Sequence, residues 1–245
     1  MPRYNIVPGA QPRAGGSQGS PCAACGIREI AVCGALQSDE LHALTKIMDG
    51  IAVNRGGIVF YEGDPARHVF NVAAGAVRLS RLLPDGRRQI TGFLFPGDFL
   101  GLAYDETYTY SAEAIERSEL CRFSRAHFET LLDDHPRMER RLLGIASNEL
   151  ATAQDQMVLL GRKTAREKLA SFLITLSRRA ERRGQESNTV HVPVTRTDIG
   201  DYLGLTIETV SRTFTALRKA KLIELQPDHA VRLLDIEGLV AIAGD

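Results

Sequence analysis

Between about Val53 and Phe128, short apolar runs rich in β-forming residues alternate with turn signals. The runs recur at intervals of roughly ten residues, a spacing typical of an all-β sandwich or barrel. The turns are marked by Gly63-Asp64-Pro65, Ala74-Gly75, Pro84-Asp85-Gly86 and Pro96-Gly97-Asp98.

The pattern becomes helical between about Pro136 and Gly161. Proline suits the first turn of a helix, and the apolar stripe that follows is close to a coiled-coil seam without being a strict heptad. Such a helix either packs on its own domain or pairs with a second copy, and its length favours pairing. The expected dimerisation residues are Met138, Leu142, Ile145, Leu150, Ala153, Met157 and Leu160.

The segment VTRTDIGDYLGLTIETVSRTFTALRKAKLIEL predicts two short helices joined by a tight turn. Thr195 and Asp198 fit a capping box that opens the first helix. Gly204 allows the turn, and Thr206 caps the second helix. The order of cap, helix, glycine, cap and helix indicates a helix-turn-helix.

Polar side chains share one face near the start of the second helix. Glu208, Ser211 and Arg212 are three and four residues apart, and a helix-turn-helix inserts this part into the major groove. Arginine can bind guanine and glutamate can accept from cytosine. A solvated helix face is the alternative, but β-rich runs around Pro227-Asp228 favour a DNA-binding wing. The candidate DNA-binding residues are Thr206, Glu208, Thr209, Ser211 and Arg212.

Composition favours a soluble protein but identifies no partner. The formal net charge is zero, although the part from Arg162 onward holds 14 Lys and Arg against 11 Asp and Glu, which weakly favours a polyanion there. No apolar run is long enough for a membrane span, and residues 1–20 look like a flexible tail without a signal sequence. We therefore expect a cytoplasmic protein that does not bind membranes.

Three of the four cysteines, Cys22, Cys25 and Cys33, lie close together in the sequence, and Cys121 is remote. Cytoplasmic thiols are usually reduced, so clustered cysteines indicate metal binding or redox chemistry. The four together can supply the ligands of an iron–sulfur cluster or of zinc. Cys22 and Cys25 can also form a redox pair, and Cys121 can be a small buried apolar residue.

The chain resembles the CRP/FNR superfamily of bacterial transcription regulators from the cysteine segment to near the C-terminus. The region FYEGDPARHVFNVAAGAVRLSRLLPDGRRQITGFLFPGDFLGL looks like the sensory β-roll of that family, and QDQMVLLGRKTAREKLASFLITLSRR looks like its dimer helix and hinge. TRTDIGDYLGLTIETVSR is similar to its helix-turn-helix, including the Glu-x-x-Ser-Arg signature.

The resemblance implies an α+β protein with a cyclic-nucleotide-binding-like β-roll, a long dimerisation helix and a C-terminal winged helix-turn-helix. The expected boundaries are 1–20 for the tail, 21–135 for the cysteine segment and β-roll, 136–161 for the dimerisation helix and 162–245 for the DNA-binding domain. Family members bind palindromic DNA as homodimers and recruit RNA polymerase. The FNR-like signature implies half-sites resembling TTGAT.

Two sensors are known within this family. Its cyclic-nucleotide sites carry a Gly-Glu pair and an Arg-Ser or Arg-Thr pair, but here Tyr110-Ser111 stands where the arginine is expected and the glutamate is not in place. We therefore expect no cyclic nucleotide, because the phosphate loses its bidentate partner. Oxygen-sensing FNR relatives instead hold a [4Fe–4S] cluster by an N-terminal group of cysteines and one cysteine after the β-roll.

The four cysteines match those cluster positions, although the C-x2-C-x7-C spacing has a longer last interval than the best-known FNR pattern and resembles the FnrN branch of FixK-like proteins. The resemblance therefore implies an oxygen-controlled regulator, mainly an activator, that binds DNA under low oxygen. A cluster-free FixK-like or cyclic-nucleotide-type regulator is the alternative. A cysteine redox enzyme fits poorly, because no thioredoxin-like βαβ pattern surrounds the cysteine pair.

The turn LLPDGRRQ matches a β-roll loop that touches RNA polymerase in activating relatives. The resemblance makes Asp85, Gly86, Arg87 and Arg88 the candidate polymerase contacts. The alternative is a solvated turn.

Overall fold

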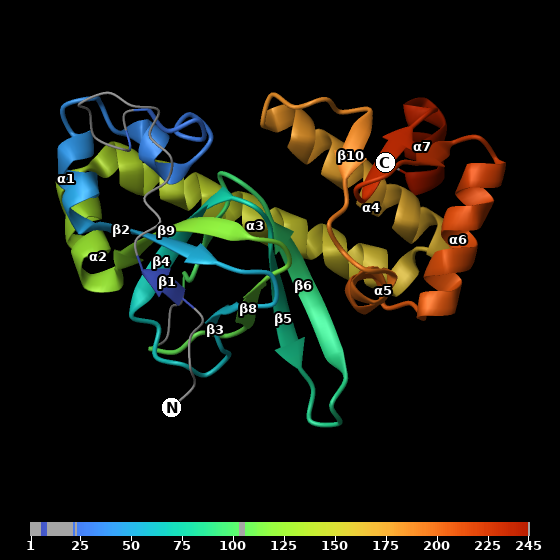
Figure 1. Cartoon of the computed structure of the whole chain (residues 1–245), viewed down its shortest axis with the longest axis horizontal. Helices are drawn as coiled ribbons and strands as arrows, with labels where there is room; N and C mark the ends of the chain where they lie inside the picture. The colour runs from blue at the N-terminus through green and yellow to red at the C-terminus, as the bar shows by residue number, and fades with distance from the viewer. Residues whose placement is uncertain (1–5, 9–21, 23, 103–105, 245) are drawn as a thin grey trace. The chain divides into compact units, whose positions relative to one another are not determined.

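The computed structural model describes residues 6–8, 22, 24–102 and 106–244 (Figure 1). The backbone divides into two compact units. The N-terminal unit comprises Met1–Arg87 and Thr91–Glu149, and the C-terminal unit comprises Arg88–Ile90 and Leu150–Asp245. Within the described residues, no helix is both long and apolar enough to cross a membrane.

The N-terminal unit contains two antiparallel sheets, as the alternation of apolar runs and turns predicted. Their strand orders are β1-β2-β9-β4-β7 and β3-β8-β5-β6. The strands are β1 Ile6–Pro8, β2 Met48–Val53, β3 Ile58–Phe60, β4 His68–Ala74, β5 Val77–Leu82, β6 Arg88–Leu94, β7 Phe99–Leu100, β8 Ser111–Ala114 and β9 Ser118–Ser124.

Strand β1 lies within the segment that we expected to be a flexible tail. Ile6–Pro8 pair antiparallel with residues 51–53 of β2, so the expectation is wrong for these three residues. The edge of β2 offers free backbone N–H and C=O groups that an extended segment satisfies. The remaining tail residues lie outside the described ones.

Side chains from both sheets meet in one core. Phe60 of β3 and Ala112 of β8 come from one sheet, and Phe70 of β4 and Leu120 of β9 come from the other. All four are at most 3% exposed. The sequence pattern alternates because each strand directs every second side chain into this shared core, which confirms the predicted β-roll.

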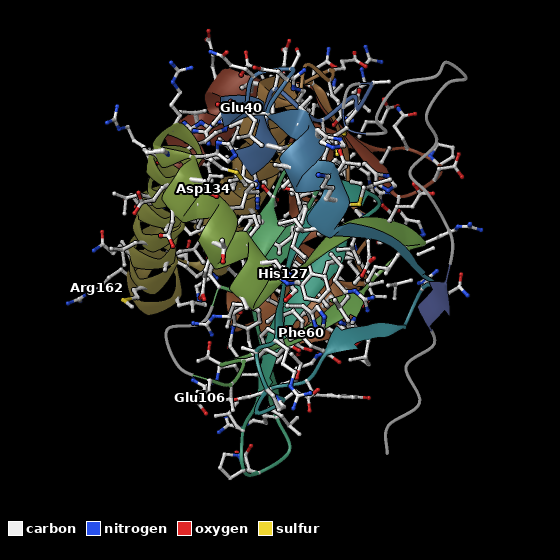
Figure 2. The ribbon with its side chains drawn as sticks, turned by 90° about the vertical axis from the view of Figure 1, so that its left-hand side faces the viewer. Glu40, Phe60, Glu106, His127, Asp134 and Arg162 are labelled. Atoms are coloured by element: carbon white, nitrogen blue, oxygen red, sulfur yellow. The ribbon has the colours of Figure 1, made fainter. Side chains whose placement is uncertain are left out.

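A second core lies under the helices of the N-terminal unit. It joins Val32, Leu41, Phe128 and Met138 to side chains of the sheet that contains β9. Helices α1 and α2 contact each other here (Figures 1 and 2). The helical elements are the 3-10 helix η1 Val32–Ala35 and the α-helices α1 Leu41–Ile47, α2 Arg125–Asp134 and α3 Pro136–Arg162.

Helix α3 begins at the expected proline and is continuous for 27 residues. The division between the two compact units falls inside it, between Glu149 and Leu150. Its first half therefore belongs to the N-terminal unit, and its second half belongs to the C-terminal unit.

The C-terminal unit has a helical core and a three-stranded sheet. The sheet order is β10-β12-β11, so the predicted hairpin gains a third strand from the extended stretch before α5. The core includes Leu173, Ile199, Phe214 and Leu239, all at most 2% exposed. The elements are α4 Ala165–Arg182, β10 Thr189–His191, α5 Arg196–Leu203, α6 Ile207–Lys219, β11 Ile223–Leu225, β12 Ala230–Leu233 and α7 Ile236–Ala243.

Candidate nucleic-acid interface and cysteine site

The turn between α5 and α6 has the predicted construction. Thr195 and Asp198 form a reciprocal capping box at the start of α5. Gly204 ends that helix in the left-handed conformation with φ of 63°, where a side chain would be strained. Thr206 caps α6 by accepting from the Thr209 N–H over 3.2 Å. Each cap of this kind stabilises its helix by about 1 kcal/mol.

Helix α6 has one buried face and one exposed polar face. Val210, Phe214 and Leu217 are at most 2% exposed and anchor the helix on its unit. Glu208, Ser211 and Arg212 are exposed, as a base-reading surface requires. The core contacts therefore fix the rotation of α6 about its axis, and that rotation presents the polar face to solvent.

The carboxyl of Glu208 is held at the start of α6. Its pKa is lowered by a hydrogen bond from its own backbone N–H, and then by the hydroxyl of Thr206 and the charge of Arg212. Glu208 is therefore ionised at neutral pH and can accept from a base. Thr209 is less exposed, and its hydroxyl lies 3.1 Å from that of Thr206. Thr206 and Thr209 thus build the cap from which Glu208 projects.

A cation–π contact that the sequence did not predict lies between α5 and α6. The guanidinium of Arg196, the first residue of α5, lies 3.2 Å from the centre of the Phe214 ring. Burial lowers the pKa of Arg196, but arginine stays charged in proteins. The contact ties the two helices together at their shared core.

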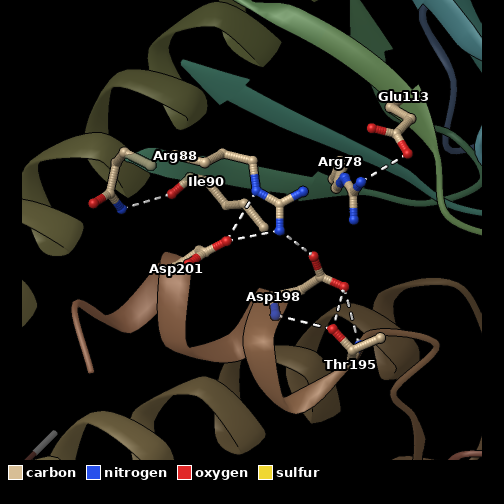
Figure 3. Close-up of polar contacts among 8 residues, drawn as sticks. Arg78, Arg88, Ile90, Glu113, Thr195, Asp198 and Asp201 are labelled. Atoms are coloured by element: carbon tan, nitrogen blue, oxygen red, sulfur yellow. Dashed lines mark hydrogen bonds and ion pairs between the residues drawn. The ribbon is translucent and has the colours of Figure 1, made fainter. Parts of the chain in front are cut away.

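Arg88 is engaged by two carboxylates of α5 within the C-terminal unit (Figure 3). Its Nη2 lies 2.7 Å from Asp198 Oδ1 and 2.7 Å from Asp201 Oδ2. Burial opposes the charge of the guanidinium, but the bonds to Asp201 and Asp198 outweigh burial and raise the pKa of Arg88. The other oxygen of Asp198 accepts from the N–H and the hydroxyl of Thr195.

The tip of the β5–β6 hairpin contains the other candidate polymerase contacts. Asp85 accepts from the backbone N–H of Arg87 over 3.0 Å and from its Nε over 2.7 Å. Gly86 has φ of 86°, which a turn residue without a side chain tolerates. Asp85, Gly86 and Arg87 are exposed. Arg88 differs, because its guanidinium is already bound to Asp198 and Asp201.

The candidate dimerisation residues of α3 fall into two groups. Met138 is fully buried, and Leu142 and Ile145 pack against the same core of the N-terminal unit. Leu150, Ala153 and Met157 are exposed, and Leu160 is half-buried. The first three side chains thus pack within their own chain.

The exposed apolar residues of α3 follow a stricter repeat than the one we expected. Leu143, Leu150 and Met157 are 66%, 62% and 71% exposed, and they are seven residues apart. Ala146, Ala153 and Leu160 are also seven apart, and they lie between them at three- and four-residue steps. This is the a/d pattern of a two-stranded coiled coil, and we call these six residues the α3 seam.

Three of the four cysteines meet at the second core of the N-terminal unit, and Cys25 is half-buried. Cys22 is buried within it, and Cys33 and Cys121 pack against it. Cys121 lies in the middle of β9, whereas Cys33 lies in η1. Cys25, Cys33 and Cys121 are free thiols.

Burial and neighbouring thiols both raise the pKa values of two of the cysteines. Burial raises the pKa of Cys121 to about 12, and the charges of Cys22, Cys25 and Cys33 add to the effect. Burial also raises the pKa of Cys33 to about 11, followed by the charges of Cys25 and Cys22. Among the described residues, no group of three or more His, Cys, Asp or Glu side chains is arranged to hold a metal ion.

A buried polar atom lies on the strand beside Cys121. The Cα of Asn71 in β4 is paired with the Cα of Cys121, and Asn71 is 3% exposed. Its Oδ1 is buried and has no hydrogen-bond partner among the described residues. Buried polar atoms in native proteins normally have a partner, so this part of the thiol site is incomplete by itself.

Aromatic side chains fill the β-roll core near the position where the family's nucleotide-binding arginine is expected. The rings of Phe60 and Tyr108 stack with centroids 3.7 Å apart (Phe60 is labelled in Figure 2). Tyr108 donates from its hydroxyl to the carbonyl of His68 over 2.7 Å. Tyr110 packs against the same core, and its hydroxyl accepts from the N–H of Gly101. The sequence pattern did not predict this stack, since it depends on pairing between distant strands.

Known protein families match both parts of the chain. Residues 51–135 match a cyclic nucleotide-binding domain, and residues 167–242 match a Crp-like helix-turn-helix domain. A solved structure of FixK2 from Bradyrhizobium japonicum has a TM-score of 0.75 and 35% identity, covering 80% of this chain and 97% of that one. A CooA mutant from Carboxydothermus hydrogenoformans shares the fold, with a TM-score of 0.67 at 20% identity, covering 81% of this chain and 88% of that one.

Curated relatives match almost the whole chain. The transcriptional activatory protein AadR of Rhodopseudomonas palustris is 43% identical over 89% of this chain and 91% of its own. The nitrogen fixation regulation protein FixK of Bradyrhizobium diazoefficiens is 43% identical over 91% of this chain and 93% of its own. The transcriptional activator protein FnrL of Cereibacter sphaeroides is 40% identical over 91% and 92%.

A β-roll, a long helix and a winged helix-turn-helix together define a class of DNA-binding regulators rather than enzymes. The domain matches and the relatives place this chain in that class, and the exposed polar face of α6 agrees with it. The matches over both units are specific enough to go further: the chain belongs to the CRP/FNR family and is a DNA-binding transcription activator of the FNR/FixK type.

Proposed function

We propose that this chain acts as a homodimer that binds palindromic DNA under low oxygen and is controlled by a [4Fe–4S] cluster. One observation carries the proposal: Cys22 and Cys33 from an N-terminal segment and Cys121 from a remote strand meet at one core, and Cys25 lies in the same N-terminal segment. Thiolates are the ligands of iron–sulfur clusters.

The donor set and its surroundings fit such a cluster. All four donors are cysteines. Cys22 lies in a largely apolar core that limits access of water, Cys33 and Cys121 pack against that core, and Cys25 is half-buried. The unpartnered Oδ1 of Asn71 marks an incomplete place beside Cys121. Cys22, Cys25, Cys33 and Cys121 would hold such a cluster through their thiolates.

The aromatic side chains packed in the β-roll core favour control by a cluster rather than by a cyclic nucleotide. Tyr110 replaces the expected arginine, and the stacked rings of Phe60 and Tyr108 occupy core space that would otherwise be open. Without a guanidinium, a bound phosphate loses its charge-assisted bidentate partner. We therefore expect no cyclic nucleotide to control this protein.

The proposed mechanism follows from the position of two groups of residues on one helix: α3 carries both the residues that pack on the cysteine core and the α3 seam. The first turns of the helix pack on the cysteine core through Met138, Leu142 and Ile145, and the α3 seam begins in the same turns. When bound, the cluster supplies cross-links among the four thiolates that oxygen can break. Met138, Leu142 and Ile145 then hold α3 in place, and the exposed seam pairs with that of a second copy.

Pairing of the seam brings together two copies of α6. Two-fold symmetry places the recognition helices about 34 Å apart, one turn of DNA. Arg212 binds guanine through O6 and N7, and Glu208 accepts from a cytosine amino group. By resemblance to FNR-like proteins, the half-sites are TTGAT-like.

RNA polymerase is the proposed partner of the β5–β6 hairpin tip. Asp85, Gly86 and Arg87 are exposed there, and the Asp85–Arg87 hydrogen bonds hold the turn in one conformation. The guanidinium of Arg88 is bound to Asp198 and Asp201. Arg88 therefore contributes to the proposed polymerase contact only indirectly.

The deciding experiment is an anaerobic absorption spectrum with iron and sulfide quantification, followed by admission of air. We expect a broad visible band that bleaches in air and about four irons per chain, as a [4Fe–4S] site requires. Cys121→Ser should lose most of the iron. A colourless, iron-free wild-type protein that still binds TTGAT-like palindromes would keep the DNA function and reject the sensor.

A further inference from the structure

Arg141 on α3 touches the cysteine segment directly. Its Nη2 donates to the backbone carbonyl of Glu29. Glu29 lies between Cys25 and Cys33 in the sequence. Arg141 thus ties the dimerisation helix to the backbone of the loop that carries the proposed ligands.

The loop has a glycine where the guanidinium of Arg141 approaches its backbone. A Cβ on Gly34 would lie 3.2 Å from Arg141 Cζ and would also collide with the backbone carbonyl of Arg28. Arg28 closes the loop by donating from Nη2 to the carbonyl of Leu36 over 2.9 Å. The absence of a side chain at Gly34 therefore lets Arg141 approach the loop backbone.

Helical geometry connects this contact to the α3 seam. Met138, Arg141 and Ile145 are three, four and seven residues apart, so they share the face that packs on the cysteine core. Leu143, two residues after Arg141, lies about 200° around the helix and starts the exposed seam. A movement of Arg141 therefore moves or rotates the seam on the same helical turn.

We infer that Arg141 is a positioning residue that transmits the state of the cysteine site to the dimerisation helix, through its bond to the backbone carbonyl of Glu29 and its close approach to Gly34. The inference rests on the proposed function, because it names the route by which cluster binding strengthens dimerisation. Arg137 is an exposed arginine one turn earlier on α3 and supplies a matched control.

The experiment compares wild type, Arg141→Gln, Arg141→Lys and Arg137→Gln as full-length chains. For each protein, the dimer dissociation constant is measured by sedimentation with and without reconstituted iron–sulfur cluster. The quantity compared is the dissociation constant without the cluster divided by that with the cluster. Arg141→Gln should bind iron but lower this ratio at least tenfold. Arg141→Lys should restore part of the ratio because it keeps the charge, and Arg137→Gln should keep the wild-type ratio.

A second measurement separates this inference from the proposed function. Backbone hydrogen exchange over residues 28–36 is followed in the cluster-free proteins, and Arg141→Gln should exchange faster than Arg137→Gln. If wild type binds no iron, the proposed function fails and this exchange measurement alone decides whether Arg141 holds the loop. If wild type binds iron and Arg141→Gln keeps both the ratio and the slow exchange, the inference is overturned while the proposed function stands.

Discussion

At the scale of single residues, the side chains most informative about DNA binding are polar ones exposed on a helix whose opposite face is buried. Arg212 projects from a helix whose opposite face is fully packed by Val210, Phe214 and Leu217. Replacing Arg212 therefore removes a surface contact without disturbing the core, so its effect on DNA binding can be read separately from stability.

We predict that Arg212→Ala loses affinity for the palindrome far more than for scrambled DNA. A bidentate arginine–guanine pair is worth about 1–3 kcal/mol, so each half-site should lose roughly 5- to 150-fold. Fluorescence anisotropy on matched specific and scrambled duplexes at one salt concentration measures both losses. Arg218→Ala, exposed in the last turn of α6, is the control and should weaken both duplexes alike. Equal loss on both duplexes in Arg212→Ala would argue against base readout.

At the scale of elements, local chemistry was predictable and distant pairing was not. The Thr195–Asp198 box and the Gly204 turn lie within ten residues of one another, and sequence reasoning placed them correctly. The pairing of β10 with β12 and the Phe60–Tyr108 stack join residues far apart in the chain. No local pattern encodes which distant strand completes a sheet.

Helix α3 illustrates the same limit. Its apolar residues were visible in the sequence, but periodicity alone assigned Met138, Leu142 and Ile145 to a partner chain. The cysteine core covers those positions, and the exposed seam begins at Leu143. The helix has two apolar faces, and only packing distinguishes the face used within the chain from the face left for a partner.

We predict that Leu150→Glu, in the middle of the α3 seam, weakens the dimer at least about 100-fold. Burying one leucine contributes roughly 1.5–3 kcal/mol, and a symmetric dimer loses two. Sedimentation velocity across a dilution series measures the dissociation constant. Ala151→Glu adds the same charge at the next, exposed position outside the seam and should leave the constant within a few-fold of wild type. A dimer equally tolerant of both changes would place the interface elsewhere.

At the scale of the whole molecule, the resemblance carried information that the residues alone did not. Four cysteines are compatible with zinc, a redox pair or a cluster, and only the family places Cys121 beside the N-terminal three. The structure adds the reason: β9 passes the core on which η1 and α3 also pack. The sequence could not predict the role of Arg141, because its side chain contacts a backbone atom of Glu29, which lies far away in the chain.

If the cluster acts only by shifting the dimer population, the effect of oxygen on DNA binding must follow mass action. When the protein is mostly monomeric, the half-saturating protein concentration varies as the square root of the dimer dissociation constant. A 100-fold weaker dimer should then raise it about tenfold. The salt dependence should stay the same in both states, since the same phosphate contacts form in the bound dimer.

Titrating labelled palindrome with anaerobic and air-exposed protein at several salt concentrations tests this prediction. Leu150→Glu is the internal control, because its weaker dimer should raise the half-saturating concentration of the anaerobic protein in the same way as air exposure of wild type, with an unchanged salt dependence. A shallower salt dependence after air exposure would mean that fewer phosphate contacts form, and oxygen would then alter the DNA-binding unit itself. An air-exposed protein that stays dimeric yet releases DNA would likewise replace a population shift with a change of orientation between recognition helices within an intact dimer.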